Sequence, residues 1–233
     1  MKKEKVVKRK STGIEMLDRY LNGGLPGGSV VLFSTDPKSM SEVFLYHFAT
    51  AQKSHYFATD RDPKYIKQNI IDFGFNIDNT TFVDVYGKYR KKGSSSSNNT
   101  GDKAIIKHFS DELEKLRKYK DFTCVIDTFS FFLELDSSYG RMKELVNQVY
   151  DITKETDSVS YLYILKGVHD PKVVNSISNT CDIIFDIESE RVGDKVTNKL
   201  LIPKIRGVFP APTQLIKYQI RDDIQIDTSM YLA

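Results

Sequence analysis

Cysteine and histidine are scarce in this chain of 233 residues, which has two of the former and four of the latter. Cys124 and Cys181 form no CxxC motif or Cys/His cluster, and both lie in apolar runs typical of buried strands. We therefore predict two reduced core cysteines in a cytosolic protein, without a disulfide framework. The four histidines fall in separate segments without metal-ligand spacing; they are His47, His55, His108 and His169.

Long apolar runs and a strong net charge are also absent. No apolar stretch approaches the roughly 18 residues that span a bilayer, and no signal-peptide core follows the charged N-terminus, so we expect a cytoplasmic protein without a membrane partner. The net charge is only +3, although residues 1–10 (MKKEKVVKRK) carry six Lys or Arg against one Glu. We interpret this basic tail as solvated, with nucleic-acid contact as the alternative.

What the chain does contain is a regular alternation of apolar runs with amphipathic segments. Its hydrophobic fraction of 40% and charged fraction of 28% are ordinary for a globular protein. The order of the segments predicts an α/β fold: a mostly parallel central sheet with helices on both faces. Predicted strands are 29–34, 55–59, 81–85, 123–127 and 160–165, and predicted helices are 40–51, 63–73, 103–118 and 141–156.

Two further segments complete the predicted organisation. After Cys181 the pattern changes to alternating strands separated by turns, which predicts an antiparallel extension at the C-terminal end. Residues 87–102 (GKYRKKGSSSSNNTGD) join a basic cluster to a Ser/Asn run, and we predict a flexible surface loop. We therefore expect one domain over 11–233, preceded by the basic tail.

The segment from Ser11 to Phe48 is the most informative part of the sequence. Its glycines and Pro26 predict a tight turn into the first strand of the sheet. It resembles the entry segment of KaiC-like and RadA-like proteins of the RecA superfamily, TGI..LD..L.GGLP.GS. The matching residues are Thr12, Gly13, Ile14, Leu17, Asp18, Leu21, Gly23, Gly24, Leu25, Pro26, Gly28 and Ser29. The resemblance extends to about Asp227 and implies a RecA-like P-loop NTPase fold, with ATP and magnesium as cofactors.

The phosphate-binding loop departs from that family pattern. An intact member has G-x-x-x-x-G-K-[ST], whose backbone N–H groups and lysine hold phosphates and whose hydroxyl binds magnesium. Here the ungapped alignment reads TDPKSMSE from 35 to 42. Thr35 and Met40 replace the two glycines, Ser41 replaces the lysine and Glu42 replaces the magnesium ligand.

These replacements oppose phosphate binding. The Met40 side chain adds bulk where backbone must approach phosphate, and Glu42 adds a negative charge. We therefore expect that a tight triphosphate site of the usual kind is lost. In the alternative, the loop follows a different backbone path and binds a nucleotide through Thr35, Lys38, Ser39 and Ser41.

The resemblance assigns further positions to catalysis. Asp127 ends an apolar strand, where the family places the acid that orients magnesium and water, so it is the candidate metal ligand if nucleotide binds. Asp60 and Arg61 align with two adjacent glutamates of the general-base region, which makes Asp60 and Asp127 the candidate catalytic residues. Asp62 precedes Pro63, and we favour a helix N-cap there.

The K-x-R-G element of the family matches Lys204 to Gly207. In the family it reaches the γ-phosphate of a neighbouring subunit, which would add Lys204 and Arg206 to the nucleotide-binding residues. Period two puts both cations on one face of a strand, where they could grip an anion or protect an exposed sheet edge.

Three functions follow from these observations. We favour a non-catalytic regulatory or scaffolding protein of the KaiC-like group, similar to archaeal KaiC-like and HTR-like proteins. The first alternative is a weak or altered ATPase acting at a subunit interface, and the second is a RadA-related nucleic-acid-binding module. A protein partner or a homo-oligomer fits the first two, whereas the third would use the basic tail and the Lys/Arg-rich loop.

Overall fold

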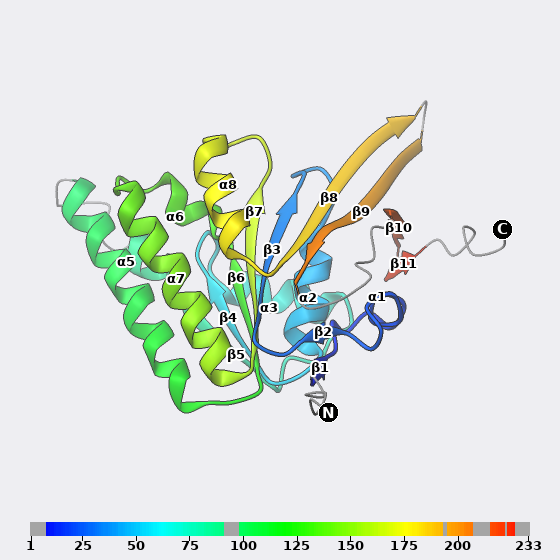
Figure 1. Cartoon of the computed structure of the whole chain (residues 1–233), viewed down its shortest axis with the longest axis horizontal. Coiled ribbons are helices and arrows are strands. Elements are labelled where there is room, and N and C mark those ends of the chain that lie inside the picture. The colour runs from blue at the N-terminus through cyan, green and yellow to red at the C-terminus, as the bar shows by residue number, and fades with distance from the viewer. Residues whose placement is uncertain (1–7, 91–97, 193–194, 207–214, 222, 227–233) are drawn as a thin grey trace, which may run out of the picture.

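A computed structural model describes residues 8–90, 98–192, 195–206, 215–221 and 223–226. Within these ranges the main sheet has nine strands in the order β11-β10-β9-β8-β3-β7-β6-β4-β5 (Figure 1). Neighbours from β8 to β5 are parallel, and β9, β10 and β11 extend the sheet antiparallel. The strands are β3 (Ser29–Thr35), β4 (Ser54–Ala58), β5 (Thr80–Asp84), β6 (Thr123–Asp127), β7 (Val159–Leu165), β8 (Ile183–Val192), β9 (Lys195–Ile205), β10 (Leu215–Ile220) and β11 (Ile224–Ile226). A separate ribbon pairs β1 (Arg9–Lys10) with β2 (Leu25–Pro26).

Helices cover both faces of the sheet (Figure 1). One face packs against α1 (Glu15–Tyr20), α2 (Glu42–Thr50) and α3 (Pro63–Asp72). The other packs against α5 (Asn98–Glu114), the 3-10 helix η1 (Lys115–Lys118), α6 (Ser130–Glu134), α7 (Tyr139–Thr156) and α8 (Pro171–Thr180). A short helix, α4 (Tyr86–Arg90), follows β5.

Strand β3 shows why its sequence suits the centre of such a sheet. Val31 and Phe33 belong to the core under α2, whereas Val30 and Leu32 belong to the core under α7. Successive side chains of a strand point to opposite faces, so a continuous apolar run fills both cores at once.

The fold class predicted from the sequence is confirmed, including the parallel order and the antiparallel C-terminal strands. Cys124 and Cys181 are buried and free, as predicted. Asp62 is the N-cap of α3, because its side chain accepts the Lys64 N–H at 2.9 Å.

The predicted loop over residues 87–102 is partly corrected. Helix α4 includes residues 86–90 and α5 begins at Asn98, while residues 91–97 lie outside the described residues. Asp84 accepts the Gly87 N–H at 2.6 Å, which satisfies a donor at the start of α4. Sequence patterning also missed α6 and α8, although Asp170 caps α8 through the Lys172 N–H at 2.8 Å.

The parallel strands place two sets of connections at opposite edges of the sheet. The carboxyl edge carries the segments that follow β3, β4, β6 and β7, whereas the amino edge carries those that precede them. In α/β sheets, ligands bind beyond the carboxyl ends of strands. Among the described helices, none is long and apolar enough to cross a membrane.

Candidate functional site

The segment after β3 is closed by hydrogen bonds among its own residues. Asp36 accepts the Lys38 N–H through Oδ1 at 2.9 Å. Ser39 donates its hydroxyl to the Asp36 carbonyl at 2.6 Å and its N–H to the same oxygen at 3.0 Å. Ser39 is buried and the Lys38 side chain is exposed, so these two candidate phosphate ligands point in different directions.

Met40 and Ser41 complete the turn into α2. Met40 adopts the left-handed conformation at φ 49°, and its side chain is 52% exposed. Only glycine adopts that conformation without steric cost, so the backbone at this position has the geometry of a glycine turn. Ser41 is buried, with its Oγ 3.4 Å from the Tyr163 hydroxyl. Burial raises the pKa of Tyr163, which keeps this hydroxyl neutral.

Asp127 is held by two partners at the end of β6. It is 2% exposed, and its Oδ2 accepts the Tyr56 hydroxyl at 2.6 Å and the Arg61 guanidinium at 3.1 Å. Burial opposes the charge on Arg61, but Asp127 together with Tyr56 and Tyr46 outweighs burial, so the pKa of Arg61 is raised and its cation persists. The buried carboxylate therefore has an internal cationic partner.

Asp60 lies beside this pair and remains exposed. Its pKa is raised by burial first, then by the negative charges of Glu134 and Asp127, against an opposing effect of Arg61. The neighbouring carboxylates thus raise the pKa of Asp60 by more than the Arg61 guanidinium lowers it.

These residues line one cleft of about 250 Å³ at the carboxyl edge. Its lining residues are Glu42, Asp60, Arg61, Asp127, Thr128, Tyr163 and Leu165. The structure therefore brings together Asp60, Asp127 and the start of α2. The cleft contains three carboxylates and one guanidinium. Over the described ranges, no group of three His, Cys, Asp or Glu side chains is arranged to hold a metal ion.

Lys204 and Arg206 do not line this cleft. Lys204 donates to the carbonyls of Ser178 at 2.7 Å and Asn179 at 3.2 Å. Arg206 donates to Asn179 at 2.6 Å and Thr180 at 3.2 Å. Both cations thus bind the carbonyl end of α8, where helix termini favour positive charge. Lys204 pairs with Ile184 at the start of β8, so within one chain both residues are remote from the cleft.

Sequence reasoning missed Tyr56 and Tyr163 as members of the site. Both lie in the middle of apolar strands, where tyrosine is as ordinary as phenylalanine. The sequence shows Arg61 only as an arginine at one of the two positions that the resemblance assigns to glutamate. The structure places β4, which Arg61 follows, next to β6 and its buried acid, so this arginine was the one available signal.

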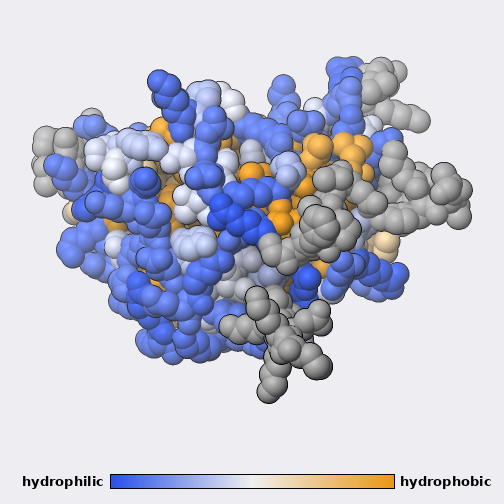
Figure 2. Space-filling view, in the orientation of Figure 1, coloured by the Kyte–Doolittle hydropathy of each residue, from blue (hydrophilic) through white to orange (hydrophobic). Residues whose placement is uncertain are grey.

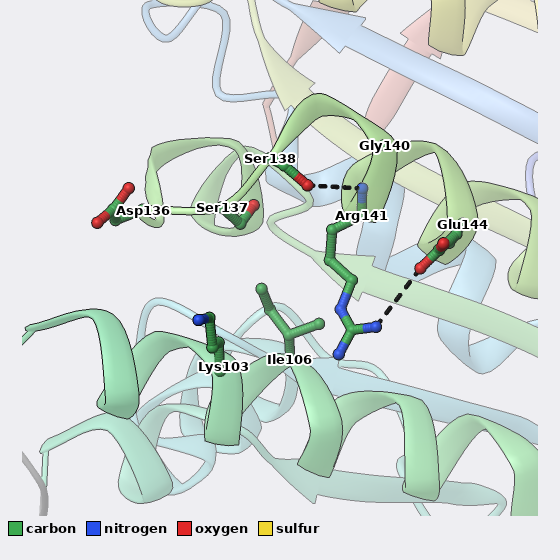
Figure 3. Close-up of a pocket in the computed structure, with 8 residues that line it drawn as sticks. All are labelled: Lys103, Ile106, Asp136, Ser137, Ser138, Gly140, Arg141 and Glu144. Carbon is green, nitrogen blue, oxygen red and sulfur yellow. Dashed lines mark hydrogen bonds and ion pairs between the residues drawn. The ribbon is translucent and has the colours of Figure 1, made fainter.

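A second, larger cavity of about 520 Å³ lies between α5 and the start of α7 (Figure 3). Lys103 and Ile106 reach it from α5, while Arg141 reaches it from α7 and pairs with Glu144 at 3.4 Å. None of the predicted site residues lines it, and it carries charges of both signs.

The topology and the position of the cleft define a RecA-like α/β fold of the KaiC type. A KaiC-like protein from Pyrococcus horikoshii has the same fold, with a TM-score of 0.70 at 16% identity over 95% of this chain and 99% of the other. The flagellar accessory protein FlaH from Methanocaldococcus jannaschii gives a TM-score of 0.72 at 14% identity, with the same coverage. Residues 9–233 match the model of a family of unknown function, DUF7125, and the chain belongs to that family.

Curated relatives at the sequence level are UPF0273 proteins. The protein from Methanopyrus kandleri is 24% identical over 165 residues, and that from Aeropyrum pernix is 26% identical over 168 residues. These matches cover 69% and 70% of this chain but only 57% and 59% of the relatives. The chain therefore spans less than two thirds of the length of these relatives.

Proposed function

We propose that this protein is a non-catalytic regulatory or scaffolding member of the KaiC-like RecA-fold group, acting through protein contacts. The proposal rests on one observation: the Asp127 carboxylate, at the position that would orient magnesium, is already paired with Arg61 at 3.1 Å. The fold has a precedent for accessory roles, since FlaH is described as a flagellar accessory protein. The identity of the partner, a second copy included, and a cytoplasmic location stay predictions.

The residues around the cleft do not fit ATP and magnesium. Ser41, at the lysine position, supplies a buried hydroxyl directed at Tyr163 in place of an ammonium group. Glu42 and Asp60 put carboxylates into the cleft, where a triphosphate would need cations. We infer a degenerate Walker A loop that keeps the backbone turn of the motif but lacks the positive charge at its lysine position.

Arg61 explains how such a site remains stable without magnesium. A carboxylate that is 2% exposed needs a cation or several donors, and Arg61 together with Tyr56 supplies them from within the chain. A magnesium ion at Asp127 would lie beside the Arg61 guanidinium, and the two cations would repel each other. The internal ion pair therefore competes with the metal that nucleotide hydrolysis requires.

Equilibrium binding of fluorescent ATP with magnesium tests this proposal, together with a sensitive assay for phosphate release. We expect no saturable binding at micromolar concentration and no turnover above that of the Asp127→Ala variant. Micromolar affinity that disappears in Asp127→Ala would refute a non-catalytic role. Turnover lost on Lys204→Ala or Arg206→Ala would instead favour a weak ATPase at a subunit interface.

A restored variant provides the matched positive control. Replacing Thr35 and Met40 by Gly, Ser41 by Lys and Glu42 by Thr returns the family pattern in the same fold. Adding Arg61→Glu frees Asp127 and restores the second glutamate. We expect ATP binding to increase at each of these two stages. If the restored loop binds no better than the natural chain, the loop residues do not account for the loss.

A further inference from the structure

The amino edge of the sheet carries cations without carboxylate partners. Lys53 precedes β4 and places its Nζ 4.9 Å from the centre of the Tyr119 ring. Lys118 places its Nζ 5.0 Å from the same ring, and the Lys120 ammonium donates to the backbone carbonyl of Glu155. In the part of the chain that the structure describes, none of these three ammonium groups pairs with a carboxylate. We call Lys53, Lys118, Tyr119 and Lys120 the amino-edge patch.

The backbone holds this patch together and brings the N-terminal segment beside it. The Lys53 carbonyl accepts the Thr123 N–H at 2.9 Å, so the starts of β4 and β6 lie side by side. Lys8 and Lys10 pair with Asp121, two residues beyond Tyr119. Figure 1 shows β1 and the N-terminal end of the described chain at this edge, opposite the carboxyl ends of the strands.

Lys53 and Lys118 also affect a neighbouring titratable group. His55 packs against Tyr119, and its pKa is lowered to about 4 by burial first and then by Lys53 and Lys118. The two ammonium groups therefore lie close enough to His55 to disfavour its protonated form.

We propose that the amino-edge patch binds single-stranded nucleic acid, with its lysines on phosphates and the Tyr119 ring stacked on a base. Single-strand binding combines a positive surface with an aromatic ring, because every base has a face that can stack. Lys53 and Lys118 are exposed and the Tyr119 ring is half-buried, so a phosphate can reach both ammonium groups while part of the ring stays accessible to a base. An acidic peptide would use the cations alone, whereas a nucleic acid uses the ring as well.

Fluorescence anisotropy of the full chain with a labelled oligothymidylate or oligouridylate tests this proposal. We expect saturable binding at low salt that weakens as salt rises, with a slope of about −0.7 in log K against log salt for each phosphate contact. The Lys53→Ala/Lys118→Ala variant should lose about ten-fold or more in affinity and show a shallower slope. Tyr119→Ala should lose about ten-fold with the slope unchanged, because stacking releases no counterions.

Lys64 and Tyr65 provide a matched control at the other edge of the sheet. The Lys64 Nζ lies 4.5 Å from the Tyr65 ring, so the same pair of residue types occurs outside the patch. Lys64→Ala/Tyr65→Ala should bind like the natural chain. Tyr119→Leu retains apolar packing against His55, and circular dichroism of each variant verifies that it is folded.

Four results would overturn the proposal. The first is no saturable binding at low salt, and the second is an equal loss in the Lys64/Tyr65 control. The third is full affinity in folded Tyr119 variants, which would leave only a non-specific cationic surface. The fourth is competition by polyglutamate or anionic vesicles as effective as competition by unlabelled oligonucleotide, which would favour an acidic protein or a membrane surface.

Discussion

Replacing Arg61 by alanine removes the cation that neutralises Asp127 within the fold. The carboxylate is 2% exposed and would keep the Tyr56 hydroxyl as its remaining side-chain partner. Breaking a fully buried ion pair costs about 3–5 kcal/mol, and losing one hydrogen bond to a charged group costs about 1.5–3 kcal/mol. Because the Arg61 side chain is 41% exposed, water entering the cleft offsets part of the loss. We therefore expect the free energy of unfolding to fall by about 1–2 kcal/mol.

Urea unfolding followed by far-UV circular dichroism measures this change. Arg19→Ala is the matched control, since Arg19 pairs with Glu15 across one helical turn with both side chains exposed. That control should cost no more than about 0.5 kcal/mol. A double-mutant cycle with Asp127→Asn should return a coupling of about 1 kcal/mol or more between Arg61 and Asp127.

The Arg61→Glu variant tests the sign of the interaction. It places a carboxylate beside Asp127 and should destabilise the protein more than Arg61→Ala does, because like charges repel in a partly dry site. Two results would contradict this expectation: an Arg61→Ala variant as stable as the Arg19 control, or a glutamate at position 61 tolerated as well as alanine. Either result would mean that Asp127 does not depend on an internal cation.

Three further predictions concern other parts of the fold. The pKa of His55 is lowered from 6.5 to about 4. Its contribution to stability, about 3 kcal/mol in full, is therefore present above pH 6.5 and lost as pH falls through 4. In His55→Phe the urea midpoint should vary less with pH over that window. Met40→Gly should raise the free energy of unfolding by about 0.5–1 kcal/mol, since glycine relieves the left-handed backbone at an exposed position; a decrease in the urea midpoint would contradict this. Replacing Lys204 and Arg206 by alanine should lower the free energy of unfolding by about 1–2 kcal/mol, because contacts to the carbonyl end of α8 are lost. Amide hydrogen exchange in α8 should become faster. Unchanged exchange would mean that the two cations do not stabilise α8 and would favour binding of an external anion.

The parallel sheet was predictable because buried strands and covering helices impose different periodicities on the sequence. The run from Val30 to Phe33 is apolar at every position, since its side chains enter two cores in alternation. Helix α8 escaped detection because Val173, Val174 and Ile177 are few apolar residues in a polar segment, although its Asp-Pro start was visible. The boundary of α5 was misplaced because Asn98 and Asn99 have weak helix propensity, which context overrides.

The sequence predicted several residues of the candidate site but not which partners they contact. Family resemblance located the segment from Thr35 to Glu42 and the acids Asp60 and Asp127, and the structure gathers Glu42, Asp60 and Asp127 in one cleft. The same resemblance assigned Lys204 and Arg206 to a phosphate, whereas within one chain they bind the end of α8. A sequence motif identifies a residue and the strand that carries it. The contacts of a long cationic side chain depend in addition on which helix end lies within its reach.

The residues alone were enough to predict the class of fold and a degenerate phosphate-binding loop at 35–42, which contains no glycine and has serine at the lysine position of the family pattern. These are local properties, since periodicity and residue chemistry can be read in one segment at a time. The pairing of Arg61 with Asp127 became visible in the folded chain, as did the approach of Lys53 and Lys118 to the Tyr119 ring. Both arrangements join segments that are more than 60 positions apart, and they depend on which strands become neighbours in the sheet.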